Sequence, residues 1–370
     1  MEKVIKFTII ILLALSLAGC SHQIREPDEL EMIRVIGIDG LEKGCTVTVC
    51  TGQPADGGKP TVRTGQGLTI DGALKNLKAA SSNRIPFYSH TQYIVIGESL
   101  ANRGIGEVLD YIARSGEMRI GTGIVIAKGS AGELIGETAV EDGSAFSNLT
   151  NIEEQSPAAG SGVMFTALDT AAALLRQSCG AAMAVELTGE DEKTVVPCGF
   201  ALLINNRLAG YLPTEDSLGG LILTDNAENV NISAEVNGSP AAFDVSGFDI
   251  EFEPLFSGNS MESLNISVKT QAFLSEMGGK FDPTDKAQKK IAEQSVSAVM
   301  CDSIVNAIRD TQAVGGDCFG IGQRARMEDP ADFDKISGDW SDIYPDLPIN
   351  ITVSVTLTGS YDMDRGLFGD

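Results

Sequence analysis

The segment Tyr93–Lys128, YIVIGESLANRGIGEVLDYIARSGEMRIGTGIVIAK, decides the fold class of this chain. Residues 93–96 and 120–127 are apolar, β-rich runs that predict two strands. The apolar residues between them recur at the spacing of one helix face: Ile105, Val108, Leu109 and Ile112. Strand, helix and strand in this order predict a βαβ unit with a right-handed crossover in a parallel or mixed sheet.

Before this unit the chain reads as further strands and one helix. Residues 35–38 predict a buried strand after a helical turn around Leu30 and Ile33. Residues 45–51 alternate and predict a second strand, joined to the first as a hairpin across residues 42–44. Alternation places Cys45 and Cys50 on opposite faces of that strand, so these two cysteines are not expected to bond each other. Residues 69–81 predict a helix.

After the unit, two polar stretches interrupt the pattern. Residues 143–162 and 225–240 are rich in Ser, Asn, Pro and Gly and predict domain boundaries or exposed loops. Between them we expect a helix over 165–177 and strands over 182–187, 195–204 and 208–212, the last two forming a hairpin.

The C-terminal part predicts strands over 248–252, 264–273 and 349–357. Between the second and third of these, Thr284 is expected to cap a long helix that ends at Asp310. Its expected buried stripe is Ala287, Ile291, Ala298, Val305 and Ile308.

The N-terminus has the layout of a bacterial lipoprotein signal. Lys3 and Lys6 precede an apolar run over 7–18, and Leu17-Ala18-Gly19-Cys20 forms a lipobox. A helix of about 12 residues rises only about 18 Å, too short for the ~30 Å hydrocarbon core, so the peptide over 1–19 is expected to be cleaved. We therefore predict lipidation at Cys20, a tether over 20–28 and a membrane anchor made of acyl chains. The alternative is an ordinary secreted protein with a chance cysteine.

The composition sets limits on partners. The formal net charge is −24, and such an acidic surface repels phosphate backbones, so no nucleic-acid partner is expected. Six cysteines follow Cys20, which permits disulfides outside the cytoplasm without fixing their pairing. The sequence offers no C-x-x-C motif, and we expect no metal and no cofactor.

Catalytic chemistry has few candidate residues. His90 is the single histidine beyond the tether, and it reads as a structural residue. The acidic groups Glu153-Glu154 and Glu190-Asp191-Glu192 are expected in solvated loops, where carboxylates are poor general acids. No serine lies in a G-x-S-x-G elbow. The chain is therefore predicted not to be an enzyme.

Several segments resemble the Ger(x)C spore germination lipoproteins, the C subunits of nutrient germinant receptors. These are residues 35–39 (VIGID), 84–90 (RIPFYSH) with 94–98 (IVIGE), the hairpin over 199–211, residues 317–322 (DCFGIG), and Trp340 with 344–350 (YPDLPIN). The chain departs from that family where Ser21 follows the lipidated cysteine, a position the family usually gives to tryptophan.

The resemblance implies an α/β (mixed α+β) fold of three domains, each a β-sheet flanked by α-helices. With the polar boundaries above, they are expected over 29–142, 143–226 and 227–370. It also implies a non-enzymatic lipoprotein at the spore inner membrane, with A-type and B-type membrane subunits as partners. The alternatives are a solute-binding lipoprotein of an ABC transporter, which needs a cleft between two similar α/β lobes, and an anchored hydrolase. Gly320 and Gly322 are expected to permit a tight turn, and Trp340 is expected to serve the fold and a subunit contact.

Overall fold

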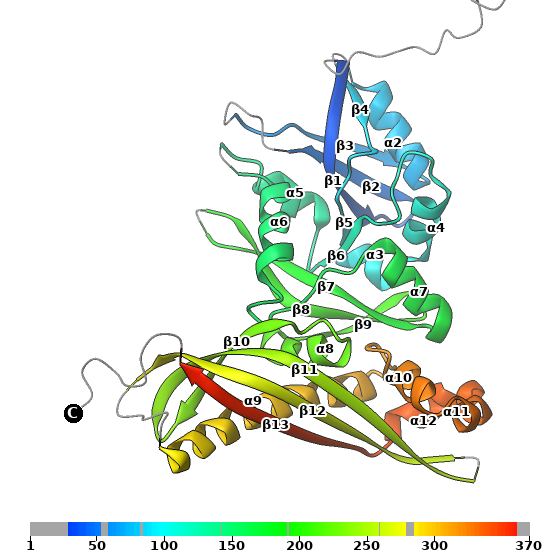
Figure 1. The fold of residues 1–370 in the computed structure, drawn as a ribbon. Coiled ribbons are helices and arrows are strands. Elements are labelled where there is room, and N and C mark those ends of the chain that lie inside the picture. The colour runs from blue at the N-terminus through cyan, green and yellow to red at the C-terminus, as the bar shows by residue number, and fades with distance from the viewer. Residues whose placement is uncertain are drawn as a thin grey trace, which may run out of the picture.

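The computed structural model describes residues 29–52, 58–81, 84–141, 143–190, 192–258, 260–278 and 285–360. Two β-sheets lie one above the other, with helices on both faces of the first sheet and on one face of the second (Figure 1). The mixed α/β class is confirmed. Cys20 and the tether lie outside the described residues.

The first sheet has nine strands. Along its main path the order is β3 (Val62–Gly67), β2 (Cys45–Thr51), β1 (Leu30–Gly40), β5 (Tyr93–Gly97), β6 (Gly123–Ala127), β7 (Cys179–Thr188), β8 (Thr194–Ile204) and β9 (Arg207–Leu212), while β4 (Ile85–Phe87) pairs with β1. The central strands β1, β5, β6 and β7 are parallel, and antiparallel strands flank them on both sides.

The predicted βαβ unit is present. Strand β5 pairs in parallel with β6, with Tyr93 opposite Gly123, and α3 (Glu98–Arg103) and α4 (Gly106–Arg114) connect them. Val108, Leu109 and Ile112 of α4 are buried, as their spacing predicts. Every residue of β5 and β6 is buried because helices cover both faces of this part of the sheet.

The two faces of the first sheet have separate cores. On one face Cys45 lies in the cluster that includes residues of α2 (Ile70–Ala79), α4 and α7 (Ala167–Gln177). On the other face Cys50 packs with residues of α5 (Ala131–Glu137) and α6 (Ala145–Gln155). The prediction that these two cysteines face opposite sides is confirmed, and all six cysteines of the described residues are free thiols.

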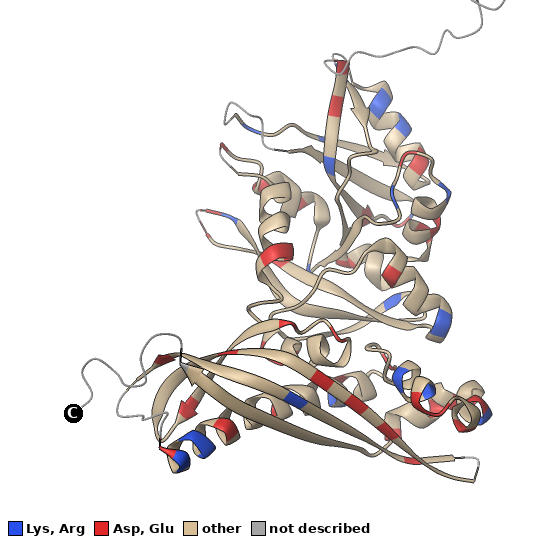
Figure 2. Ribbon diagram, viewed as in Figure 1, with Lys and Arg blue, Asp and Glu red and all other residues tan. Residues whose placement is uncertain are grey.

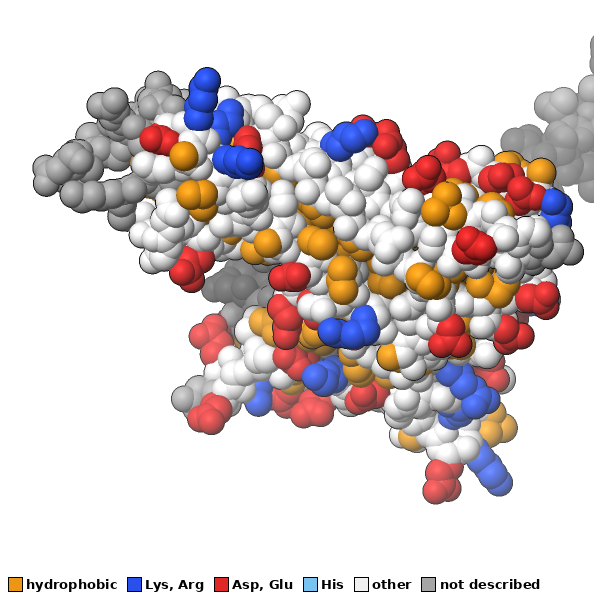
Figure 3. All heavy atoms as spheres, turned by 90° about the horizontal axis from the view of Figure 1, so that it is seen from below, with side chains coloured by type: hydrophobic (Ala, Val, Ile, Leu, Met, Phe, Trp, Pro, Cys, Tyr) orange, Lys and Arg blue, Asp and Glu red, His pale blue; other side chains and the backbone are white. Residues whose placement is uncertain are grey.

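The second sheet has the order β10 (Asn229–Val236), β11 (Ser239–Ser257), β12 (Ser260–Met277) and β13 (Ile349–Ser360). Helix α9 (Lys286–Ala313) packs along one face (Figure 1). Glu251 and Glu253 of β11 are exposed. Acidic positions recur along the strands of this sheet (Figure 2). Viewed from below, hydrophobic side chains form an interrupted band across this end of the molecule (Figure 3).

Short helices fill the space at the junction of the two sheets. The segment η2 (Thr214–Asp216) and helix α8 (Ser217–Leu223) lead from β9 to β10. After α9 the chain forms α10 (Ile321–Glu328), α11 (Pro330–Ile336), η3 (Ser337–Asp339), α12 (Trp340–Ile343) and η4 (Tyr344–Asp346) before it enters β13. One hydrophobic cluster extends from Phe200 and Leu202 of β8 through these helices into the second sheet.

Several local predictions were wrong. Residues 145–155 form α6, and a capping box between Ser144 and Ser147 stabilises its first turn. The polar residues at the beginning of this stretch therefore belong to a helix N-terminus and not to a loop. Residues 229–236 form β10, where Asn, Ser and Glu alternate with buried residues. Leu30 and Ile33 belong to β1, so the helical turn is absent.

The long helix α9 differs from its prediction in its N-cap residue and in its buried face. Asp285 caps α9 through its side chain, whereas Thr284 lies outside the described residues. Ile291 and Val305 are exposed, and of the predicted stripe only Ile308 is buried. The buried face instead contains Val296, Met300, Ser303 and Ile304. The polar Ser303 can be buried there because its hydroxyl is hydrogen-bonded.

The described strands form two sheets, so a separate sheet for each of three domains is not observed. Strands of the predicted first and middle domains pair directly, because β6 lies beside β7, with Val125 opposite Met183. The boundaries after residues 142 and 226 stay predictions.

Candidate functional site at the junction of the two sheets

Asp317 is the centre of the junction. Its side chain lies between α9 and α10 and is 3% exposed. Oδ1 accepts a hydrogen bond from the backbone N–H of Ile321 at 2.8 Å, and Oδ2 accepts one from that of Gly322 at 2.7 Å. The indole Nε1 of Trp340 donates to the same Oδ2 at 3.1 Å. The carboxylate thus satisfies free N–H groups of the first turn of α10 and holds Trp340 against it.

Burial raises the pKa of Asp317 above its usual value, and the donors of Gly322, Ile321 and Trp340 offset part of this rise. These hydrogen bonds hold the carboxyl group in place at the junction.

Two glycines of the signature serve different purposes. Gly320 has φ +76°, which permits the left-handed turn into α10 and confirms the predicted turn at this residue. Gly322 lies inside α10, and a Cβ there would come within 2.5 Å of Nε1 and Cε2 of Trp340. Its role is close approach to the indole, so the turn expectation was wrong for Gly322.

Trp340 is buried in an aromatic group. Its ring centroid lies 5.2 Å from that of Phe333 and 5.7 Å from that of Tyr344. The Tyr344 hydroxyl shares a 2.6 Å hydrogen bond with Thr311 of α9. The side chain of Gln312 donates to the carbonyl oxygens of Tyr344 and Leu347 at 3.0 and 2.9 Å. These contacts fix the entry into β13, and Trp340 serves the fold as predicted.

The same signature contacts the first sheet. The side-chain amide of Gln177, at the end of α7, donates to the carbonyl oxygen of Asp317 at 2.9 Å. Phe319 meets Phe200 of β8 edge to face at 5.7 Å between centroids. The DCFGIG signature therefore joins the two sheets.

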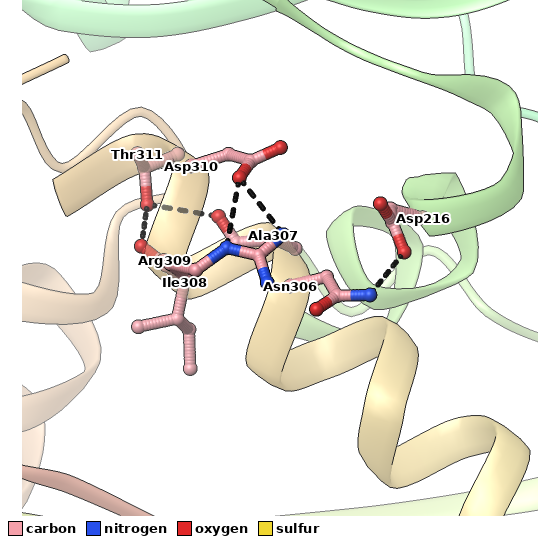
Figure 4. A network of polar contacts seen from close by, with 7 residues as sticks. All are labelled: Asp216, Asn306, Ala307, Ile308, Arg309, Asp310 and Thr311. Atoms are coloured by element: carbon pink, nitrogen blue, oxygen red, sulfur yellow. Dashed lines mark hydrogen bonds and ion pairs between the residues drawn. The ribbon is translucent and has the colours of Figure 1, made fainter. Parts of the chain in front are cut away.

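A second link connects α9 to the η2–α8 segment (Figure 4). Asn306 donates to the Asp216 carboxylate at 2.8 Å, as Figure 4 shows. The Ser303 hydroxyl donates to the carbonyl of Asp216 at 3.0 Å. The backbone N–H of Gly219 donates to the same hydroxyl at 2.8 Å. The helices approach so closely that a Cβ on Gly219 would lie 2.2 Å from the carbonyl oxygen of Ser303.

Two open clefts lie on either side of the signature. One, of 590 Å³, lies between the end of α7 and helices α10 to α12 and includes Trp340 in its wall. The other, of 470 Å³, lies between α7 and the start of α10. Gln177 and Arg176 border both, and neither cleft holds a serine or cysteine beside a histidine.

The remaining candidate residues lie apart from the junction. His90 is exposed beside Phe87, with 5.7 Å between ring centroids. Glu153 and Glu154 belong to α6 rather than to a loop, and Glu153 accepts a hydrogen bond from Tyr93. Asp191 lies outside the described residues. Among those residues, no three His, Cys, Asp or Glu side chains are placed to hold a metal ion.

The signature and Trp340 are recognisable in the sequence, but the residues that contact them are not. Gln177, Thr311 and Asn306 are polar residues within or at the end of helices, where such residues normally face water. Thr311 is fully buried where α9 packs against its neighbours. The sequence alone does not distinguish it from a polar residue on the surface of a helix.

Within the part of the chain that the structure describes, every helix is too short or too polar to span a bilayer.

Comparisons with known proteins agree with this architecture. Residues 23–185 match the family described as spore germination protein N-terminal domain, and residues 198–361 match the one described as spore germination B3/GerAC like, C-terminal. Spore germination protein B3 of Bacillus subtilis (strain 168) is 20% identical, with 96% of this chain and 97% of that protein covered. The putative spore germination protein YfkR of the same organism is 19% identical, with 80% and 78% covered.

The solved structure titled "Crystal Structure of the GerBC protein" has the same fold. It superposes with a TM-score of 0.55 at 15% identity and covers 90% of this chain and all of that one. The matches to both domain families together extend over most of the chain, from the first sheet to the last strand. The chain belongs to the Ger(x)C family of spore germination proteins.

Proposed function

We propose that this chain is a non-enzymatic lipoprotein subunit of a nutrient germinant receptor, anchored at the spore inner membrane through Cys20. Its partners in this proposal are an A-type and a B-type membrane subunit. The observation that carries the proposal is family membership over both halves of the fold, residues 23–185 and 198–361.

The anchor is supported by the sequence that precedes the described fold. The lipobox at 17–20 lies about ten residues before β1, which begins at Leu30. An extended chain of ten residues spans at most about 35 Å, so a lipid on Cys20 would keep the first sheet close to the bilayer surface. Multiple acyl chains are needed for stable anchoring, because one chain binds a membrane only reversibly.

A role without catalysis is supported by the site itself. The most distinctive residues of the family signature, Asp317 and Trp340, are buried and bonded to each other. Their arrangement joins α10 to α12 and both to the first sheet, which suits a subunit that must present a fixed surface to its partners.

The transporter alternative fits the structure less well. A solute-binding lipoprotein of that type needs two similar α/β lobes around its ligand. Here one unit contains a nine-stranded mixed sheet and the other a four-stranded sheet with one long helix. The clefts at their junction are bounded by an irregular helical segment.

The anchor is tested by replacing Cys20 with Ala in the producing organism and labelling with a radioactive fatty acid. The parent chain should take up label and fractionate with membranes, whereas Cys20→Ala should take up none and leave the membrane fraction. Ser21→Ala, which keeps the lipobox cysteine, is the matched control. An unlabelled parent together with a membrane-bound alanine variant would contradict the lipoprotein assignment.

The receptor role is tested with spores that lack this chain. Such spores should germinate more slowly on the nutrients that this receptor detects, as followed by loss of optical density. The wild-type gene should restore the rate. Equal nutrient responses with and without the chain, over all nutrients that germinate the parent spores, would contradict the receptor role.

A further inference from the structure

A cleft of 490 Å³ lies on the first unit, away from the junction of the sheets. Helices α2 and α4 form its sides, and Tyr88, which follows β4, forms part of its wall. Leu74, Tyr88 and Tyr111 give it an apolar surface. These elements lie together at one side of the first sheet (Figure 1). Tyr88 belongs to the RIPFYSH segment and directly follows β4.

Tyr88 contains an unusual polar group. The residue is 3% exposed, and its hydroxyl is buried without a hydrogen-bond partner among the described residues. Buried polar groups are nearly always hydrogen-bonded, because an unpaired one costs about 1–3 kcal/mol. Tyr88 is one of the residues that line the cleft, so the unpaired hydroxyl belongs to a side chain of its wall.

Two of the basic side chains that line the cleft have ion-pair partners, and a third has none within the described residues. Lys75 is paired with Asp71 at 2.6 Å, and Arg114 is paired with Asp110 at 2.8 Å. Lys78 is half-buried and has no ion pair within the described residues. Glu117 also lines the cleft, but it is exposed and therefore screened by water. The strongest unsatisfied charge of the cleft is the ammonium of Lys78.

We infer that this cleft binds a small organic acid with a ring-sized apolar body. Its carboxylate would pair with Lys78, its body would pack against Leu74 and Tyr111, and a second acceptor atom would take the hydrogen bond of the Tyr88 hydroxyl. This binding does not depend on the receptor role proposed above.

The inference is tested by isothermal titration calorimetry on the full chain in detergent. The probe is 4-acetylbenzoate, which combines a carboxylate, a ring and a ketone acceptor. Benzoate lacks the ketone, and acetophenone lacks the carboxylate. We expect 4-acetylbenzoate to bind most tightly and acetophenone to bind at least tenfold more weakly.

Two variants separate the contacts. Tyr88→Phe removes only the hydroxyl and should weaken 4-acetylbenzoate at least fivefold while leaving benzoate unchanged. Lys78→Gln should weaken both acids at least tenfold. Lys193→Gln, a lysine in the turn between β7 and β8, is the control and should change neither affinity.

The melting temperature gives an independent readout. Because the Tyr88 hydroxyl is unpaired in the free protein, Tyr88→Phe should keep or raise the melting temperature. The inference is overturned if none of the three probes binds, if Tyr88→Phe binds 4-acetylbenzoate as the parent does, or if that variant melts several degrees lower.

Discussion

Truncation of Trp340 is the sharpest test of the junction. The indole is 8% exposed, touches Phe333 and Tyr344, and donates to Asp317. Removing a buried tryptophan side chain costs about 3–5 kcal/mol of unfolding free energy, because packing is lost and a cavity remains. Loss of one donor leaves Oδ2 of Asp317 with only the Gly322 N–H, which adds to that cost. Trp340→Ala should therefore lose about 4 kcal/mol, a large part of the ~5–15 kcal/mol stability of a typical domain.

The assay is urea unfolding followed by far-ultraviolet circular dichroism, since Trp340 is the single tryptophan and its fluorescence disappears with it. Trp340→Phe keeps a ring but removes the Nε1 donor, and it should lose about 1–3 kcal/mol. Leu175→Ala is the control, because Leu175 is 87% exposed and should stay within about 0.5 kcal/mol of the parent. A Trp340→Ala protein within about 1 kcal/mol of the parent would refute the role of this residue in the fold.

Three further predictions concern the same junction. Asp317→Asn places an amide donor against the N–H donors of the pocket and should cost about 2–4 kcal/mol, measured by urea unfolding. Because the folded pKa of Asp317 is raised, the contribution of this group to stability is fully present below the unfolded carboxyl pKa and is lost as pH rises through the folded value. The stability of the parent relative to Asp317→Asn should thus fall as pH rises, and a rise instead would contradict the burial argument. Ser303→Ala should cost about 1–3 kcal/mol because the buried N–H of Gly219 loses its acceptor, and an unchanged melting temperature would contradict the link between α8 and α9. Gly322→Ala should lower the melting temperature because its Cβ would clash with Trp340. The control Gly136→Ala, in α5, should raise the melting temperature because a Cβ there has no atom within contact distance. Equal effects of the two variants would show that the indole does not restrict Gly322.

Much of the first sheet could be predicted from the sequence because its strands are buried on both faces. The apolar runs of β5 and β6 and the stripe of α4 leave little ambiguity. The hairpins also followed from local turn residues, as with Asn205-Asn206, which both adopt positive φ.

The errors share a physical cause. The polar residues at 143–162 predict a domain boundary or an exposed loop, but Ser144 and Ser147 satisfy the free N–H groups of a helix start. In α9, Ile291 and Val305 are apolar but exposed, so the helix face that the apolar spacing predicts to be buried is not the buried one. Ser303 and Thr311 lie on the true buried face, since their hydroxyls bond the neighbouring backbone.

The site shows the same limit. The sequence identifies Asp317 and Trp340 as a signature, but the hydrogen bond between them joins residues 23 positions apart. Gln177, which joins the signature to α7, lies 140 positions from its partner. Contacts at such separations depend on how β7 and α9 are brought together, which no local pattern encodes.

The most direct test of the receptor role is purification of the tagged chain from detergent-solubilised inner membranes of dormant spores, with mass spectrometry of what accompanies it. We predict two multi-span membrane proteins of the A-type and B-type receptor classes in amounts comparable to the chain itself. A preparation from Cys20→Ala spores, normalised to the amount of chain, should contain less of both. Recovery of an ATPase with a permease, or of no membrane protein at all, would contradict the account.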